Sequence, residues 1–360
     1  MPAVILSCMN RCLEDPNRLH ESKEMRIIVI LTVREEGDVI AETLRGFLEW
    51  ADELFIYDTG SLDETYQIIQ DYECRYKGRI TCCREEVLFK DPIRGYVFAL
   101  FRQRFRNGDW ICMADADEIY HISPRIFLST QCDSHEHAVF IQYYNFWFTT
   151  DHLRLWLSGE ASLMDRSKPV FERLRHYMVG IHPGETRLFR YRSSMHWLPN
   201  EGCPRNSGFP AKEKIPVRHY PFRDPPQMIR RAALRKWMLE NVWDAKTRMQ
   251  SHWNWNWFQT IKNSNSDGVQ FWQPGAEFPL VRRSDHLRPP TSTKGQILLF
   301  LQRYNLILLR DIFRRRAKLA TLRPSRISNE ARMQLEDEFR KAADWRAELP
   351  PHLISGVDSV

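Results

Sequence analysis

Hydrophobic and polar positions alternate in regular blocks from Arg26 to about residue 125. An apolar run rich in β-branched residues, "RIIVILTV", is followed by the charged "REEGD" and then by "VIAETLRGFLEWA", where apolar residues recur at helical spacing. A second apolar run, "ELFIYD" from Glu53, leads into the helical pattern "YQIIQDYECRY", and "RITCCREEV" follows as a third strand. The pattern predicts an α/β protein whose parallel sheet carries helices on both faces.

A further helix and a fourth strand follow in the same half of the chain. "RGYVFALFRQRFRNG" predicts a helix that stops at Gly108, and "DWICMADADEI" predicts the strand. In open α/β sheets, ligands gather beyond the carboxyl ends of the strands. We therefore expect the polar strand ends, which are Arg34 and Glu35, Asp58, and Asp115 and Asp117, to face one shared cleft.

After about residue 135 the pattern changes. "AVFIQYYNFWFTT" and "ETRLFRYRSSMHW" predict aromatic strands without strand–helix alternation, and "QMIRRAALRKWMLENVWDA" predicts a long helix. Basic or polar amphipathic helices are expected over 294–320 and 329–348. This part of the chain is thus predicted to be an α+β half of the same domain.

Composition places the chain among folded proteins, with 360 residues of which 43% are hydrophobic. The longest apolar run, "GQILLFLQRYNLILLRDIF", is interrupted by Gln302, Arg303, Asn305 and Arg310, so no membrane-spanning helix is expected. The first residues lack the basic start and long apolar region of a secretory signal, which favours a cytoplasmic protein. The eight cysteines form no C-x-x-C pair, which argues against a metal cluster or a disulfide scaffold.

Charge adds one open question. The net charge is +6, and the stretch "RDIFRRRAK" is strongly basic. Two interpretations have equal weight. In one, the helix lies on an anionic membrane surface, and the protein is bound peripherally at the inner face of that membrane. In the other, the helix packs on the domain and its arginines are solvated. No nucleic-acid partner is expected, because the basic residues are not interleaved with a known recognition motif.

The acids of "MADADEIY" are the first candidates for chemistry. If the segment is a strand, Asp115 and Asp117 project to the same side about 6.6 Å apart, near enough to share a divalent cation. The alternative is a solvated acidic turn. In "YDTGSLDET", the Asp58 carboxylate at a strand end can accept hydrogen bonds from a nucleoside, while Ser61 and Asp63 cap the next helix.

Together, "VILTVREEGDVIAETL", "LFIYDTGSLDET" and "GDWICMADADE" resemble glycosyltransferase family 2 over about residues 25–125. This resemblance implies a GT-A-like (Rossmann-like) mixed sheet flanked by helices, and transfer of a sugar from a nucleotide-sugar with inversion at the anomeric carbon. It implies that Glu35 and Asp58 contact the nucleoside. It also implies that the D-x-D motif, Asp115 and Asp117, holds the ribose-diphosphate and a Mg²⁺ or Mn²⁺ ion, with UDP-sugars as the first expectation for the donor.

The chain departs from the family pattern in both of its first two motifs. Arg34 stands where the family usually has Asn, and Thr59 and Leu62 change the usual "DDGSTDGT". These departures bear on the nucleoside contacts more than on the fold.

Further roles follow from the resemblance. Arg94 is a candidate diphosphate contact, and His219 in "VRHYPFRDPP" is a candidate third metal ligand. An inverting transferase needs a general base for the acceptor hydroxyl. Glu201 is the first choice on the stretch "RLFRYRSSMHWLPNEG", and Glu185 and Asp151 are rivals. For the base candidates and for His219, a solvated or packed loop residue is the competing interpretation.

The sequence therefore predicts a metal-dependent inverting glycosyltransferase that acts on a glycan or lipid-linked acceptor, of the kind that builds a surface polysaccharide or glycolipid. Two alternatives stay open. One is a noncatalytic protein that binds a nucleotide-sugar or glycan; the other is a nucleotidyltransferase, for which a Gly-rich phosphate loop after the first strand would be expected. The predicted organisation is an N-terminal extension at 1–24, a transferase domain at 25–260 and a helical C-terminal extension at 261–360. The transferase domain divides into a nucleotide-sugar-binding half at 25–125 and an acceptor half at 126–260.

Overall fold

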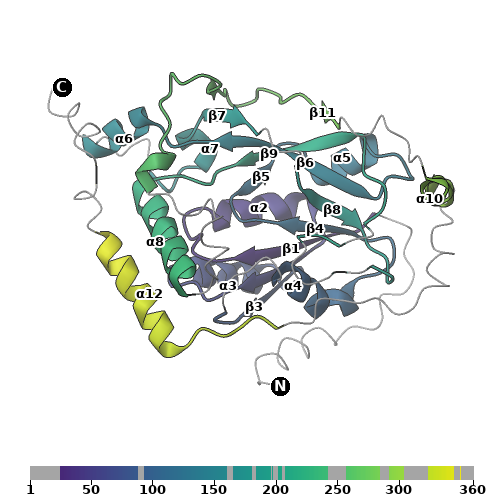
Figure 1. Ribbon diagram of the computed structural model, residues 1–360, viewed down its shortest axis with the longest axis horizontal. Helices are drawn as coiled ribbons and strands as arrows, with labels where there is room; N and C mark the ends of the chain where they lie inside the picture. Colours follow the sequence, from purple (N-terminus) through teal and green to yellow (C-terminus); the bar gives the residue numbers. More distant parts are fainter. Residues whose placement is uncertain are drawn as a thin grey trace.

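A mixed sheet flanked by helices forms the centre of the protein (Figure 1). The computed structural model describes residues 25–87, 93–159, 165–180, 184–195, 197, 202–204, 207–241, 257–283, 292–303, 323–343 and 349. One half of the sheet is parallel, in the order β3-β2-β1-β4. Its strands are β1 (Ile27–Val33), β2 (Glu53–Asp58), β3 (Ile80–Arg84) and β4 (Trp110–Ala114).

Strand β1 shows why this half is covered on both faces. All seven of its residues are buried. Ile27, Val29 and Leu31 pack in the cluster that holds α2 (Ile40–Trp50) and α3 (Thr65–Arg75). Ile28 and Ile30 pack in the opposite cluster with α4 (Ile93–Phe101). The predicted α/β arrangement with helices on both faces is therefore confirmed.

The sheet continues with strands of both directions. Strand β8 (Thr186–Arg190) is antiparallel to β4, and β6 (Ala138–Phe146) is antiparallel to β8. Strand β9 (Glu213–His219) is parallel to β6 and pairs with the short β5 (Glu118–Tyr120) that follows β4. This half also contains η1 (Arg102–Arg104), α5 (Pro124–Thr130), α6 (Thr150–Leu157), α7 (Val170–Arg173) and β7 (His176–Val179).

The segment after residue 260 is more than the helical extension that the sequence predicts. Beside α10 (Thr293–Arg303) and α12 (Asn329–Lys341), it supplies β10 (Gln270–Phe271), which pairs with β7, and β11 (Val281–Arg282), which pairs with β9. Strands of two residues are too short to produce a periodic pattern, so they were missed. In the part of the chain that the structure describes, no helix is long and apolar enough to cross a membrane.

Two helices from distant parts of the sequence lie side by side at one end of the molecule (Figure 1). Helix α8 (Pro225–Asn241) lies beside α12. The next described element after α8 in the chain is η3 (Trp257–Thr260). Trp237 and Met238 of α8 pack against Leu335 of α12, which has no exposed surface. Helix α12 thereby fixes the position of α8.

The segment before α12 and the first turn of α12 contact the residues that follow β3. Arg323 pairs with Glu85 at 3.0 Å, and Arg332 pairs with Glu86 at 2.6 Å. Between them, the Ile327 amide donates to the Glu86 carbonyl at 3.0 Å. The carboxyl end of β3 is therefore joined to the C-terminal segment.

A buried guanidinium joins the loop after β1 to the residues just before α8. The Arg223 side chain has no exposed surface. Its Nε and Nη2 donate to Asp38 at 2.6 and 2.8 Å, and Nη2 also donates to Glu36 at 2.5 Å. These charge-assisted hydrogen bonds hold the start of α8 against the carboxyl end of β1.

Replacing Arg223 with methionine should lower the free energy of unfolding by about 3–5 kcal/mol, because Glu36 and Asp38 would stay buried without their cation. Urea denaturation measures this change. Arg282→Met is the matched control: Arg282 pairs with Glu213 at the surface, with 62% of its side chain exposed, so a change within about 1 kcal/mol is expected. Equal losses in the two variants would contradict a structural role for the buried network.

Candidate active site

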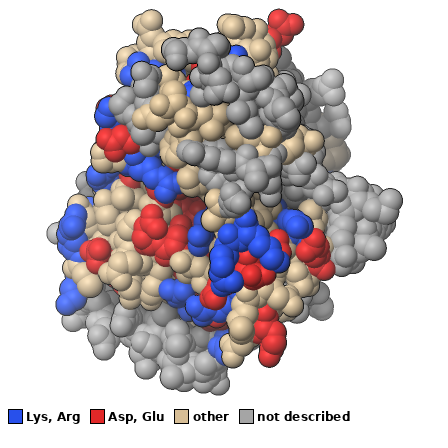
Figure 2. Space-filling view, turned by 90° about the vertical axis from the view of Figure 1, so that its left-hand side faces the viewer, with Lys and Arg blue, Asp and Glu red and all other residues tan. Residues whose placement is uncertain are grey.

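A cavity of about 490 Å³ lies at the carboxyl ends of β1 and β4 and is closed on one side by α8. The face that carries α8 and α12 shows acidic and basic side chains intermixed near its centre (Figure 2). We call this cavity the larger cavity, because a second cavity, described below, is smaller. Its lining includes three of the acids expected in a shared cleft: Glu35, Asp115 and Asp117. Arg94, Glu185 and His219 line it as well. The cavity thus brings together most of the predicted site residues.

Asp115 and Asp117 lie in the turn between β4 and β5, not in a strand. The spacing expected from strand geometry therefore does not apply. Arg94 Nη2 donates to both carboxylate oxygens of Asp115 at 2.7 Å, and Arg187 donates to the same carboxylate at 2.6 Å. Burial alone would raise the pKa of Asp115, but Arg187 and Arg94 outweigh it and hold that pKa below its usual value. Arg94, predicted to meet the diphosphate, contacts the D-x-D motif in this structure.

Asp117 and His219 form the part of the cavity that suits a metal ion. Oδ2 of Asp117 lies 3.6 Å from Nε2 of His219, near the separation of roughly 3 Å between adjacent ligands of an octahedral Mg²⁺ ion. Nδ1 of His219 is 2.8 Å from the side-chain oxygen Oδ1 of Asn145. With a proton on Nδ1 for that contact, the neutral ring has its lone pair on Nε2, the atom that a cation would bind. This pair fits a divalent cation of the type expected.

The electrostatics of Asp117 agree with that chemistry. Burial would raise its pKa, yet the opposing effects of His219 and Arg231 hold the pKa of Asp117 well below its usual value. Arg231 Nη1 lies 2.9 Å from Oδ2. Asp117 is therefore a carboxylate at neutral pH, the form in which it binds a cation.

Three potential metal ligands come together elsewhere among the described residues. Asp133, His135 and Glu136 have ligand atoms within 4.8 Å of one another, but none of them lines the larger cavity. Lys212 already contacts two of them, with Nζ 2.7 Å from Asp133 and its amide 3.1 Å from Glu136. In the part of the chain that the structure describes, no third His, Cys, Asp or Glu completes such a cluster with Asp117 and His219.

Glu35 stands at the boundary of the larger cavity. Its φ of 59° is in the left-handed region, which costs a non-glycine residue about 1–3 kcal/mol. The Leu62 amide donates to its Oε1 at 2.6 Å, and Arg230 Nε donates to its Oε2. Burial raises the pKa of Glu35, Asp63 adds to the increase, and Arg230 opposes it. A strained backbone and two donors thus fix this carboxylate at the cavity wall.

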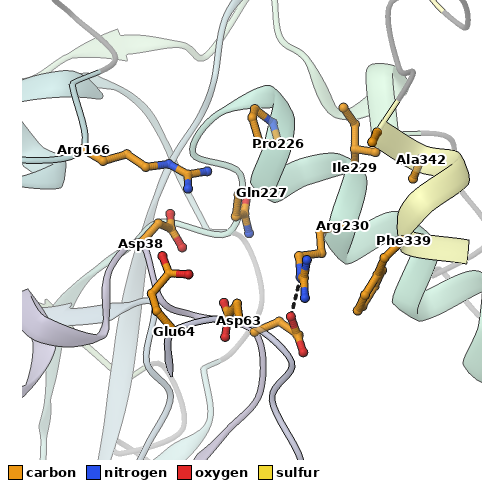
Figure 3. Close-up of a pocket in the computed structure, with 12 residues that line it drawn as sticks. Asp38, Asp63, Glu64, Arg166, Pro226, Gln227, Ile229, Arg230, Phe339 and Ala342 are labelled. Carbon is orange, nitrogen blue, oxygen red and sulfur yellow. Dashed lines mark hydrogen bonds and ion pairs between the residues drawn. The ribbon is translucent and has the colours of Figure 1, made fainter. Parts of the chain in front are cut away.

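A second cavity of about 320 Å³ borders the first at Glu35 and Gln227. Figure 3 shows Arg230 beside Phe339 of α12, with the guanidinium carbon 4.1 Å from the ring centroid. Asp63 lies below Arg230 in the same view. The Glu35–Arg230 ion pair therefore stands where the two cavities meet.

Asp58 does not lie where the resemblance implies. It has no exposed surface and lines neither of these cavities. Its carboxylate accepts hydrogen bonds from the amides of Gly60 and Ser61 and from the Ser61 hydroxyl. With φ of 102°, Gly60 makes the sharp turn that these bonds stabilise. In this structure the Asp58 carboxylate stabilises its own turn, and the nucleoside contact that the resemblance implies stays a prediction.

The candidates for the general base separate clearly. Glu201 lies outside the described residues. Asp151 on α6 pairs with Arg154 at 3.0 Å and accepts from Ser264, and it lines neither cavity. Glu185 lines the larger cavity with 48% of its side chain exposed, 3.6 Å from Arg94 and 3.5 Å from Arg187. Of the described candidates, only Glu185 is placed to meet a ligand there.

The backbone around Glu185 is tightly held. Gly184 has φ of 90°, and a Cβ added to it would lie 2.3 Å from the Ile141 carbonyl oxygen. The Ile141 amide donates to the Glu185 carbonyl at 3.0 Å. Only glycine allows this close approach to β6, so it determines where the Glu185 side chain enters the cavity.

Several residues of the cavity were not predicted from the sequence. Burial raises the pKa of Glu36 and of Glu118 to about 7 in each case. Arg187 bonds both Asp115 and Glu118. Two more cavity residues, Arg231 and Arg235, did leave a signal in the sequence. In the "RRAALR" stretch of α8 they are one helical turn apart, so they share a face of the helix, and both line the cavity.

Comparison with known proteins finds a similarity in the N-terminal part of the chain. One similar solved structure is glucosyl-3-phosphoglycerate synthase from Mycobacterium tuberculosis in complex with phosphoglyceric acid. The match has 15% identity and a TM-score of 0.25, and covers 50% of this chain and 66% of that chain, just under two thirds of its length. A likeness at this level indicates nothing about substrates. No curated protein matches. The sequence model described as glycosyl transferase family 2 matches residues 28–159. Over this segment, which runs from β1 to just past α6, the chain is therefore similar to glycosyltransferase family 2.

Proposed function

We propose that the protein transfers a sugar from a nucleotide-sugar to an acceptor hydroxyl, with inversion at the anomeric carbon and with a divalent cation bound in the larger cavity. The observation that carries this proposal is the convergence of Asp115, Asp117, His219 and Glu185 on one cavity of about 490 Å³. That volume suits a ligand of nucleotide-sugar size.

The residues of the cavity divide into a donor side and an acceptor side. Asp117 and His219 would hold the cation, which when bound would offset the charge of the departing nucleoside diphosphate. Asp115 and Glu35 would orient the donor, and Arg94 and Arg187 position Asp115 through their ion pairs.

Glu185 is the proposed general base, in place of Glu201. Its carboxylate would take the proton of the acceptor hydroxyl as the acceptor oxygen bonds to the anomeric carbon. The bond from that carbon to the phosphate oxygen breaks on the opposite side, and its electron pair leaves with the nucleoside diphosphate. The products are the glycosylated acceptor, the nucleoside diphosphate and one proton.

Two expectations from the sequence stay predictions. The acceptor class, a glycan or a lipid-linked acceptor, rests on the resemblance. Peripheral contact with a membrane rests on the basic segment 294–320. Only 294–303 of that segment is described, and its Ile297 and Phe300 are each 56% exposed. The division at residue 260 also stays a prediction, with the strands β10 and β11 as the structural departure from it.

Thermal unfolding in the presence of nucleoside diphosphates tests the proposed donor site. We expect UDP with Mn²⁺ to raise the melting temperature, since a ligand at about 100 times its dissociation constant stabilises the folded state by about 2.7 kcal/mol. UDP, GDP and CDP, with ADP as a control, are compared with and without Mn²⁺. A shift for one nucleotide that needs Mn²⁺ supports the proposal. A protein that none of the nucleotides stabilises contradicts it.

A further inference from the structure

Helix α8 presents two guanidinium groups to the larger cavity. Arg231 and Arg235 are four residues apart, so their side chains lie on the same face of the helix, and both line the cavity. Arg231 Nη1 is 2.9 Å from Asp117 and 3.0 Å from the Pro221 carbonyl oxygen. The pair therefore lies on the D-x-D side of the cavity, next to the proposed cation ligands.

The surroundings of the pair favour an anion. Burial lowers the pKa of Arg235 to about 9, and the positive charge of Arg231 adds to this effect. The positive charges of Arg231 and Arg235 repel each other, the carboxylates of Asp117 and Glu36 oppose this repulsion, and an anion bound beside the pair would oppose it further. Planar guanidinium groups also match the oxygen geometry of phosphate, to which they bind through two hydrogen bonds.

The helix that carries the pair is held at both ends. Before its first turn, Arg223 binds Glu36 and Asp38. Near its last turn, Trp237 and Met238 pack on Leu335 of α12. Arg231 and Arg235 therefore project from a fixed element, which is what a site needs to recognise a ligand by geometry.

We propose that Arg231 and Arg235 form a clamp for the diphosphate of the nucleotide-sugar, on the side of the cavity that holds Asp117. This assignment rests on the proposed function. In it, Arg231 exchanges its contact with Asp117 for a phosphate oxygen when the donor enters, and Arg235 completes the clamp from the next turn of α8. Both are positioning residues: they hold the leaving group, whose negative charge increases as the sugar–oxygen bond breaks.

Calorimetric titration of the full chain with UDP in the presence of Mn²⁺, and with uridine, tests the clamp. Arg235→Gln should weaken UDP binding by about 10- to 100-fold, the range for loss of a charge-assisted hydrogen bond. Uridine lacks phosphates, so its affinity should not change. Melting temperatures of the free proteins verify that each variant is folded.

Lys236→Gln is the matched control. Lys236 is the next residue of the same helix, with 63% of its side chain exposed and a contact to Glu338 at 3.5 Å, and it lines neither cavity. It should bind UDP as the wild type does. UDP binding that is unchanged in Arg235→Gln, or weakened equally in both variants, overturns the clamp. A wild type that binds no nucleoside diphosphate instead contradicts the proposed function, so the two failures are distinguishable.

Discussion

Replacing Glu185 with glutamine should reduce sugar transfer by about 100- to 10,000-fold, the usual contribution of a positioned general base. Glutamine keeps the size of the side chain but cannot accept the acceptor proton. The affinity for the nucleoside diphosphate should not change, because the loss falls on the acceptor side of the cavity. Turnover with the donor identified by thermal unfolding, and UDP titration of the same preparation, measure the two effects separately.

Two further variants make the result specific. Glu277→Gln removes a carboxylate that is 82% exposed, pairs with His121 and lines neither cavity, so its turnover should equal that of the wild type. Glu201→Gln tests the base that the sequence placed first. Loss of turnover in Glu201→Gln with full activity in Glu185→Gln would show that the base assignment is wrong.

Replacing Asp117 with asparagine should weaken Mn²⁺-dependent UDP binding by at least about 100-fold. Loss of a residue that only orients a metal ligand already costs about 10- to 100-fold in affinity, and Asp117 is proposed to bind the cation itself. Asparagine has nearly the same shape, but it carries no charge to attract the ion. Titration of UDP at several Mn²⁺ concentrations measures the change.

The control for this variant is Asp133→Asn. Asp133 belongs to the other group of potential metal ligands, with His135 and Glu136. We expect its loss to leave UDP binding as it is. If Asp133→Asn abolished the Mn²⁺ dependence while Asp117→Asn kept it, the cation would bind outside the larger cavity and the proposed metal site would be wrong. The melting temperature of each variant without ligand reports any loss of folding, since Asp117 also pairs with Arg231.

The parallel half of the sheet could be predicted because local patterns determine it. The run "RIIVILTV" is apolar at nearly every position, and such a run is typical of a strand buried on both faces, as β1 is. Asp115 and Asp117 could be identified since they follow such a run directly. Their place in a turn was missed, because β4 ends at Ala114 and pairing with β9 begins again only at Glu118.

The rest of the site depends on contacts between distant parts of the chain. Arg231 and Arg235 look like ordinary surface residues of an amphipathic helix until α8 is packed across the end of the sheet. The role of Asp58 depends on how the Gly60 turn closes on it. Glu185 was only one of three carboxylates until the close approach of Gly184 to β6 showed where its side chain points. These are packing outcomes, which residue spacing does not encode.

The contacts between the C-terminal segment and β3 set an order of events during synthesis. Arg323 and Glu85 are separated by 238 residues, and Arg332 and Glu86 by 246. At about 5–20 residues per second, the ribosome adds the later partner tens of seconds after the earlier one. Strand β3 lies at the end of the parallel half, and an unpaired strand edge is prone to aggregate. The residues that follow this edge strand therefore lack their C-terminal partners during most of translation, and a chain that stopped before residue 323 would never gain them.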